Sequence, residues 1–114
     1  MFSLKRVYEP RTQEDGCRVL VERLWPRGLS KNKAALALWL KDIAPSTELR
    51  TWFAHDPVKW SDFQTRYRSE LRQRPDLIRQ LRKMAKTERV TLVYAAHDQE
   101  HNAAVVLKAY LERK

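Results

Sequence analysis

The sequence predicts a small α/β layered domain with a mainly parallel sheet of three or four strands packed by helices. Strand-forming runs rich in β-branched and aromatic residues occupy positions 4–8, 18–24 and 90–95. The second and third runs are separated by a long stretch in which apolar residues recur with helical spacing. Because a strand, a helical excursion and another strand form a right-handed crossover, we expect the second and third strands to be parallel.

The length and composition agree with one domain. The chain has 114 residues, of which 43% are apolar, and domains commonly contain about 100–150 residues. We therefore expect residues 1–114 to form a single α/β domain around one core.

The connection between the first two strands leaves one point of topology open. Pro10 and the pair Asp15-Gly16 lie in this connection and are typical of a turn. Its nine residues are long for a hairpin and short for a parallel crossover, so the direction of the first strand is not predicted.

Helices are predicted from capping residues and apolar spacing. Ser46 caps a short helix, Asp56-Pro57 begins a helix that runs to about Gln73, Pro75 begins another, and the last helix begins near Asp98. The residues expected to face the core are Leu49, Trp52 and Phe53, then Trp60, Phe63, Tyr67 and Leu71, then Leu77, Ile78, Leu81 and Met84, and finally Ala103, Val106, Leu107 and Tyr110. The run from Ala34 to Leu40 is apolar at nearly every position, so its pattern fits a buried helix and a buried strand equally well.

Charge and cysteine content indicate the environment of the protein. The net charge of +9 favours attraction to anions such as nucleic acid, nucleotides or acidic membranes. The single cysteine, Cys17, excludes an internal disulfide and a multi-cysteine zinc site, which is typical of a reducing compartment. The sequence contains no signal-peptide pattern and no run long enough to span a bilayer, so we expect a cytoplasmic protein without a membrane partner.

The sequence predicts no cofactor and no metal ion. Gly16 and Gly28 are the only glycines, so the chain lacks a glycine-rich phosphate loop. His97 and His101 are four residues apart and superficially resemble a zinc-binding helix. His97, however, is expected to precede the first helical turn, and no third ligand is evident.

The candidate ligand site comprises two loops that follow predicted strands, at positions 24–28 and 96–98. Ligands of parallel sheets bind outside the carboxyl ends of the strands, and arginine offers planar donors for phosphate or carboxylate. The expected ligand-binding residues are Arg23, Trp25, Arg27, Tyr94, His97 and Asn102. An alternative is that internal carboxylates or carbonyls hold Arg23 and that Trp25 belongs to the core. Asp98 is more readily explained as a helix cap.

A basic stripe supports an alternative function. Arg79, Arg82, Lys83 and Lys86 follow helical spacing on the face opposite Ile78, and positive charge is concentrated in residues 61–90. Such a stripe could neutralise the phosphates of a nucleic acid, making the protein a non-enzymatic nucleic-acid-associated protein, although basic faces also serve only for solvation. A third possibility is a protein-binding module with exposed tryptophans.

Several segments resemble the bacterial YeaO-like family, within the domain of unknown function 488 group. The segments are 15–28, with the specific block Arg23-Leu24-Trp25-Pro26-Arg27-Gly28, then Ala44-Pro45-Ser46 with Leu49-Arg50, and Thr91 to Ala96 with Asp98 and Asn102-Ala103. The resemblance implies a small cytoplasmic α/β protein. Longer relatives in the group carry a Cys-His-Arg triplet near the start of the last helix, where this chain has His101-Asn102-Ala103. A cysteine-based mechanism therefore does not carry over.

The leading hypothesis is that the strand-end loops bind a small anionic ligand, phosphate-like or nucleotide-like. Any chemistry there would use a histidine as proton carrier and arginines to stabilise charge. The sequence does not decide whether the protein is an enzyme, nor does it predict an oligomeric state.

Overall fold

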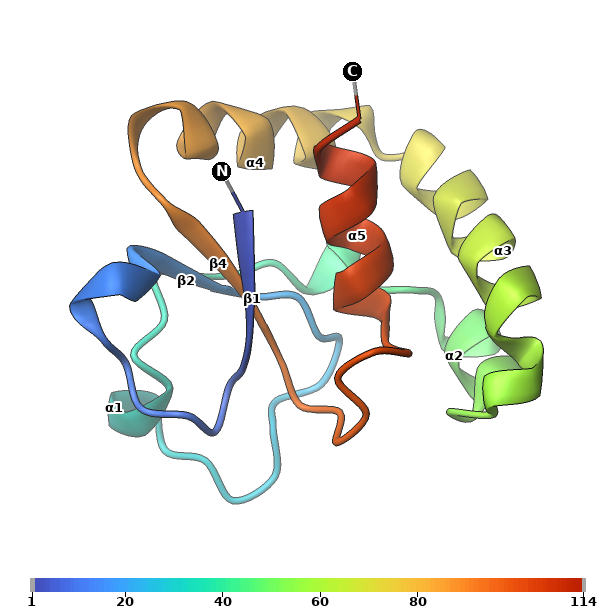
Figure 1. Ribbon diagram of the computed structural model, residues 1–114, viewed down its shortest axis with the longest axis horizontal. Helices are drawn as coiled ribbons and strands as arrows, with labels where there is room; N and C mark the ends of the chain where they lie inside the picture. The colour runs from blue at the N-terminus through green and yellow to red at the C-terminus, as the bar shows by residue number, and fades with distance from the viewer. Residues whose placement is uncertain (1, 114) are drawn as a thin grey trace.

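The computed structural model describes residues 2–113 and contains the predicted α/β sheet (Figure 1). The strands are β1 (Phe2–Arg6), β2 (Cys17–Leu20), β3 (Leu38–Trp39) and β4 (Val90–Tyr94), in the order β1-β4-β2-β3. Every pairing is parallel, including that of β1 with β4, which settles the direction that the sequence left open. β4 is central, with Leu92 opposite Leu4 on one side and Val19 on the other.

Within the described residues, five α-helices connect and cover these strands. They are α1 (Lys31–Ala34), α2 (Thr47–Phe53), α3 (Trp60–Arg72), α4 (Pro75–Thr87) and α5 (Ala103–Leu111), with short 3-10 turns at Gln13–Asp15, Lys41–Ile43 and Pro57–Lys59. Ser46 and Asp56 act as the predicted caps, accepting from the amides of Leu49 at 3.2 Å and Val58 at 3.0 Å. No helix within residues 2–113 is long and apolar enough to cross a membrane.

The bounds of several elements differ from the sequence-based expectations. Pro57–Lys59 is a 3-10 turn, so α3 begins at Trp60 rather than at Pro57. β1 lies two residues earlier than predicted, and Tyr8 is exposed. β2 ends at Leu20 rather than at position 24, because beyond it the carbonyl of Glu22 accepts from the Trp39 indole instead of a neighbouring strand. α5 begins at Ala103 and not near Asp98, because Asn102 is its N-cap, accepting from the Val105 amide at 3.0 Å.

The undecided run from Ala34 to Leu40 contains both kinds of structure. α1 ends at Ala34, Ala35 has a left-handed conformation with φ of 48°, and β3 follows at Leu38–Trp39. Because a helix end and a short strand share this run, its apolar pattern could not favour one of them.

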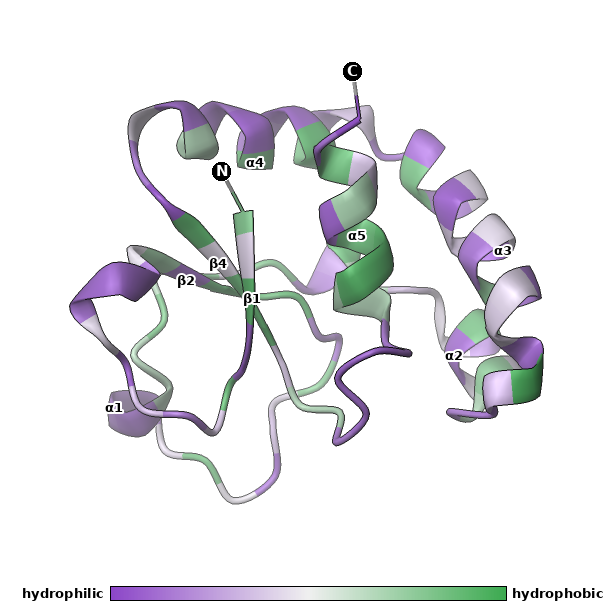
Figure 2. Ribbon diagram, viewed as in Figure 1, coloured by the Kyte–Doolittle hydropathy of each residue, from purple (hydrophilic) through white to green (hydrophobic). Residues whose placement is uncertain are grey.

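The larger core lies between one face of the sheet and helices α2 to α5. Alternate strand residues point into it, among them Val90, Leu92 and Tyr94 of β4. The predicted apolar residues of α3 and α4 belong to or pack against this core, whereas in α5 the buried residues are Ala104, Val106, Leu107 and Leu111, with Ala103 and Tyr110 partly buried. Figure 2 shows α5 as mainly hydrophobic and much of α3 and α4 as hydrophilic.

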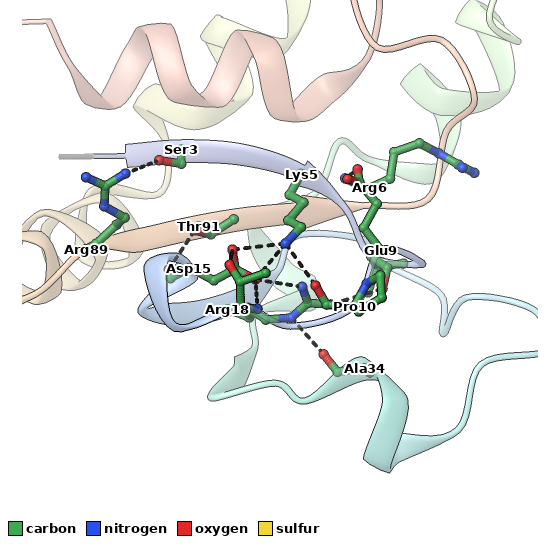
Figure 3. Close-up of polar contacts among 12 residues, drawn as sticks. Ser3, Lys5, Arg6, Glu9, Pro10, Asp15, Arg18, Ala34, Arg89 and Thr91 are labelled. Atoms are coloured by element: carbon green, nitrogen blue, oxygen red, sulfur yellow. Dashed lines mark hydrogen bonds and ion pairs between the residues drawn. The ribbon is translucent and has the colours of Figure 1, made fainter.

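The opposite face of the sheet carries a smaller apolar cluster beside a buried ion network (Figure 3). The side chain of Arg18 is fully buried, and its guanidinium donates to Asp15 at 3.1 Å and to the carbonyls of Val7 at 3.0 Å and Ala34 at 2.9 Å. Lys5 also pairs with Asp15 at 3.1 Å. The network joins the end of β1, β2, α1 and the turn before β2. It therefore holds these segments together on the face of the sheet opposite the larger core.

Candidate functional site

A cavity of about 290 Å³ lies where the chain leaves the adjacent strands β2 and β4. It is thus placed at the carboxyl ends of parallel strands, the edge at which ligands of such sheets bind. Its lining residues come from five segments of the chain: Glu22, Arg23 and Leu24; Ala44 and Pro45; Arg50, Phe53 and His55; Phe63; and Ala95, Ala96, Asn102 and Ala103.

The backbone around Pro45 fixes the Arg23 side chain at one wall of the cavity. Its Nη2 donates to the carbonyl of Ala44 at 3.1 Å and its Nε to that of Pro45 at 3.3 Å. Since guanidinium has five N–H donors, these two bonds leave the Nη1 edge able to contact a ligand. Arg23 is therefore held in one orientation without losing its charge to a carboxylate.

Glu22 places a carboxyl group in the same cavity. Burial raises its pKa above the usual range, while the Ala95 amide and the charge of Arg50 lower it in part. A carboxyl group with a raised pKa can donate a hydrogen bond to an anion when it is protonated.

α2 and α3 contribute a second guanidinium and an aromatic wall. Arg50 is exposed and lines the cavity, and its positive charge acts to lower the pKa of Glu22. Phe53 and Phe63 stack with ring centroids 4.2 Å apart. The cavity is thus cationic and polar on one side and apolar on the other, a combination suited to a small molecule that has an anionic group and a flat apolar part.

The loop between β4 and α5 closes the remaining side and is held mainly by its own residues. The Asp98 carboxylate accepts from the amides of Glu100 at 2.9 Å and His101 at 3.0 Å, and these bonds lower the pKa of Asp98. The Asn102 side chain donates to the Asp98 carbonyl at 2.8 Å while it caps α5. Asp98 therefore caps a turn of its own, one turn before the helix that it was expected to begin.

The structure brings together two of the six residues that the sequence singled out as ligand-binding. Arg23 and Asn102 line the cavity. Trp25 packs edge-on against Trp39, at 5.4 Å between centroids, in the smaller cluster on the other face.

The other three candidates are placed elsewhere. Arg27 is exposed, and its carbonyl accepts from the Tyr8 hydroxyl at 3.0 Å. Tyr94 is buried in the larger core, and His97 is exposed without lining the cavity. We expected the Trp25 loop to face the Tyr94–His97 junction across one site. Of the residues predicted there, only Arg23 and Asn102 line the cavity.

Sequence reasoning missed Glu22, Arg50 and His55. One signal was available for Glu22, since it follows a strand that is otherwise apolar, next to Arg23. For Arg50 and His55 there was no local signal, because only the tertiary packing of α2 and of the residues after it brings them to the cavity.

The basic stripe lines a different hollow. Arg79, Arg82, Lys83 and Lys86 border a groove next to Tyr110, with no residue in common with the cavity. Arg82 is largely committed to the fold, donating to the carbonyls of Leu111 at 3.1 Å and Tyr110 at 3.2 Å.

Metal ligands and an activated thiol do not come together in the described structure. Among residues 2–113, no three side chains of His, Cys, Asp or Glu are grouped so that they could hold a metal ion. A hydrogen bond with Glu88, together with burial, raises the pKa of Cys17. The neighbouring Arg18 is not available to lower the pKa of this thiol, because its guanidinium is bound to Asp15.

Comparison with known proteins identifies the family. The chain is 45% identical over 107 residues to "Uncharacterized protein YeaO" of Escherichia coli (strain K12), covering 94% of this chain and 93% of that protein. It is 42% identical over 106 residues to "Uncharacterized protein Rv3073c" of Mycobacterium tuberculosis (strain H37Rv), covering 93% and 89%. No solved structure matches the chain significantly. The profile of DUF488-N3i, described as the inactive DUF488-N3 subclade, matches residues 1–114, and the chain therefore belongs to this DUF488 family.

Proposed function

We propose that the protein binds a small anionic ligand in the cavity at the carboxyl ends of β2 and β4 and does so without turning it over. The proposal rests on one observation: the guanidinium groups of Arg23 and Arg50 and the partly buried carboxyl group of Glu22 line the same cavity. The groups come from the end of β2 and from α2, so only the folded chain assembles them.

The chemistry of the cavity favours a carboxylate or a phosphate with an apolar part. Arg23 is oriented in advance by the carbonyls of Ala44 and Pro45, which reduces the entropy lost when a ligand binds. Phe53 and Phe63 are buried and stacked on each other, and they make one part of the cavity lining apolar. Asn102 also lines the cavity, but its amide group is bound to Asp98 and Val105 and therefore serves to hold the wall in place.

Binding without turnover is supported by two features. The family description calls the subclade inactive, and the chain has His101-Asn102-Ala103 where longer relatives of the group carry a cysteine, a histidine and an arginine. Of these three residues, Asn102 is fully employed in the fold, as N-cap of α5 and as donor to Asp98. The proposed role is therefore that of a ligand-binding protein.

The test is a thermal-shift titration with phosphate, adenosine monophosphate and benzoate, using wild type, Arg50→Gln and Arg27→Gln. The two variants lose the same charge from exposed positions, but only Arg50 lines the cavity. We expect at least one ligand to raise the melting temperature of wild type and Arg27→Gln, and to have little effect on Arg50→Gln. The proposal is wrong if none of the three ligands stabilises wild type, or if both variants lose the effect equally.

A further inference from the structure

A second hollow lies at the other end of the sheet from the proposed ligand cavity. It is a groove of about 730 Å³ between α4 and the carboxyl-terminal part of α5, where Arg82 reaches the last carbonyls of α5. In Figure 1, α4 lies across the top, beside the amino end of β4, whereas the strand ends that form the cavity lie below. The residues that line the groove are Leu71, Arg72, Pro75, Ile78, Arg79, Arg82, Lys83, Lys86, Thr87 and Tyr110.

The groove is strongly positive. Five of its lining residues are Arg or Lys, and none of the described lining residues is acidic. Asp76 pairs with Arg79 at 3.0 Å, but both side chains are mostly exposed, so water and salt screen this pair. Arg113 adds a further cation beside Arg82 and Tyr110. The electrostatic potential of the groove therefore favours an anionic partner.

The spacing of the cations indicates a polyanion. Arg79, Lys83 and Lys86 follow one another along one face of α4 and are exposed. At a rise of about 1.5 Å per residue, Arg79 and Lys83 are separated by about 6 Å along the helix axis, and the row extends for about 10 Å. A row of this kind matches a chain of successive negative charges better than it matches one isolated phosphate.

Tyr110 gives the groove an aromatic surface. Its ring lines the groove, is partly exposed and has the Arg113 guanidinium 5.7 Å from its centroid. Single-stranded nucleic acids are held by this combination, in which cations contact the backbone and aromatic rings stack on unpaired bases. An acidic membrane is disfavoured, because the large exposed apolar side chains, Tyr8, Leu24 and Val58, do not border the groove.

We propose that the groove between α4 and α5 binds single-stranded nucleic acid, with Arg79, Lys83 and Lys86 against the phosphates and Tyr110 stacked on a base. Arg82 positions the two helices by holding the end of α5 and is not counted among the phosphate contacts. This site is independent of the ligand cavity, since the two share no lining residue.

The first test measures the anisotropy of a labelled oligodeoxythymidylate at several salt concentrations. The site variant is Lys83→Glu with Lys86→Glu, and the matched control is Lys31→Glu with Lys33→Glu on α1, where both lysines are also exposed. Both pairs of substitutions change the net charge equally. We expect the site variant to bind about tenfold or more weakly than the control, with its salt slope smaller by about 1 to 1.5. Equal losses in the two variants would show that only net charge matters and would overturn the proposal.

The second test separates a single strand from other polyanions. Tyr110→Leu is expected to weaken oligodeoxythymidylate binding several-fold while leaving the salt slope unchanged, because it removes stacking and no charge. Duplex DNA and vesicles containing phosphatidylserine are the competitors. If either displaces the oligonucleotide as well as an unlabelled single strand does, or if Tyr110→Leu binds like wild type, the assignment to single strands is refuted.

Discussion

Replacing Asp15 with Asn would test the ion network on which the sheet depends. Asp15 is the only carboxylate within 4 Å of the Arg18 guanidinium among the described residues, and the Arg18 side chain has no exposed surface. Removing one partner of a buried pair leaves a desolvated charge, which costs about 3–5 kcal/mol. The carbonyls of Val7 and Ala34 still accept from Arg18, so we expect the lower end, about 3 kcal/mol.

Urea denaturation followed by tryptophan fluorescence measures this loss, since the chain has four Trp. The double variant Asp15→Asn/Arg18→Met should be more stable than the sum of the two single losses predicts, by about 1 kcal/mol or more. A loss below about 1 kcal/mol for Asp15→Asn, or strictly additive losses, would refute the reasoning.

The same network predicts a dependence on pH. Burial alone would raise the pKa of Asp15, but bonds from the Thr12 amide, Lys5 and Arg18 outweigh it and lower the pKa from 3.8 to about 2. Because the folded-state pKa is the lower one, the stabilisation is present above pH 3.8 and is lost as the pH falls toward 2. The Asp15→Asn variant should lack this particular loss, so its unfolding free energy approaches that of wild type as the solution becomes more acidic.

Two further substitutions probe the region around the cavity. Burial raises the folded-state pKa of Glu22 above 4.5, so the free energy of unfolding should fall as the pH rises above that value. Glu22→Gln should remove this fall. Urea titrations of both proteins at pH 4 and pH 7 measure it, and an equal response of the two proteins would contradict the interpretation. The buried Tyr67 hydroxyl donates to the Ile43 carbonyl at 2.7 Å, so Tyr67→Phe should lower the unfolding free energy by about 1–2 kcal/mol, whereas an unchanged urea midpoint would mean that the carbonyl finds another donor.

The fold could be predicted from the sequence where one physical signal dominated. β4 is buried along its whole length, so its run of apolar and β-branched residues identified it within one residue. α3 and α4 begin close to Asp56-Pro57 and at Pro75, because proline and capping residues act locally. Such signals depend on a few neighbouring residues and need no knowledge of the rest of the fold.

The candidate site was less predictable, because distant packing decides where its side chains lie. Trp25 was equally compatible with a ligand loop and with a core, and its contact with Trp39 places it in the smaller cluster. Arg50 lies on a helix whose approach to the end of β2 has no local sequence signature. The sequence therefore placed Arg23 and Asn102 at the edge of the sheet where the cavity lies, but not the remaining residues that line it.

The structure also separates arginines that serve the fold from cations that remain available. Arg6, Arg18, Arg23, Arg74 and Arg82 all donate to main-chain carbonyls at the ends of strands, helices or turns. Each satisfies acceptors that would otherwise need water or a cap. These bonds leave the positive charges in place but reduce the number of N–H donors that the five arginines can offer to a partner. Lys83 and Lys86 of α4, in contrast, are exposed and form no ion pair with described residues, so their ammonium groups remain available to a partner at the groove.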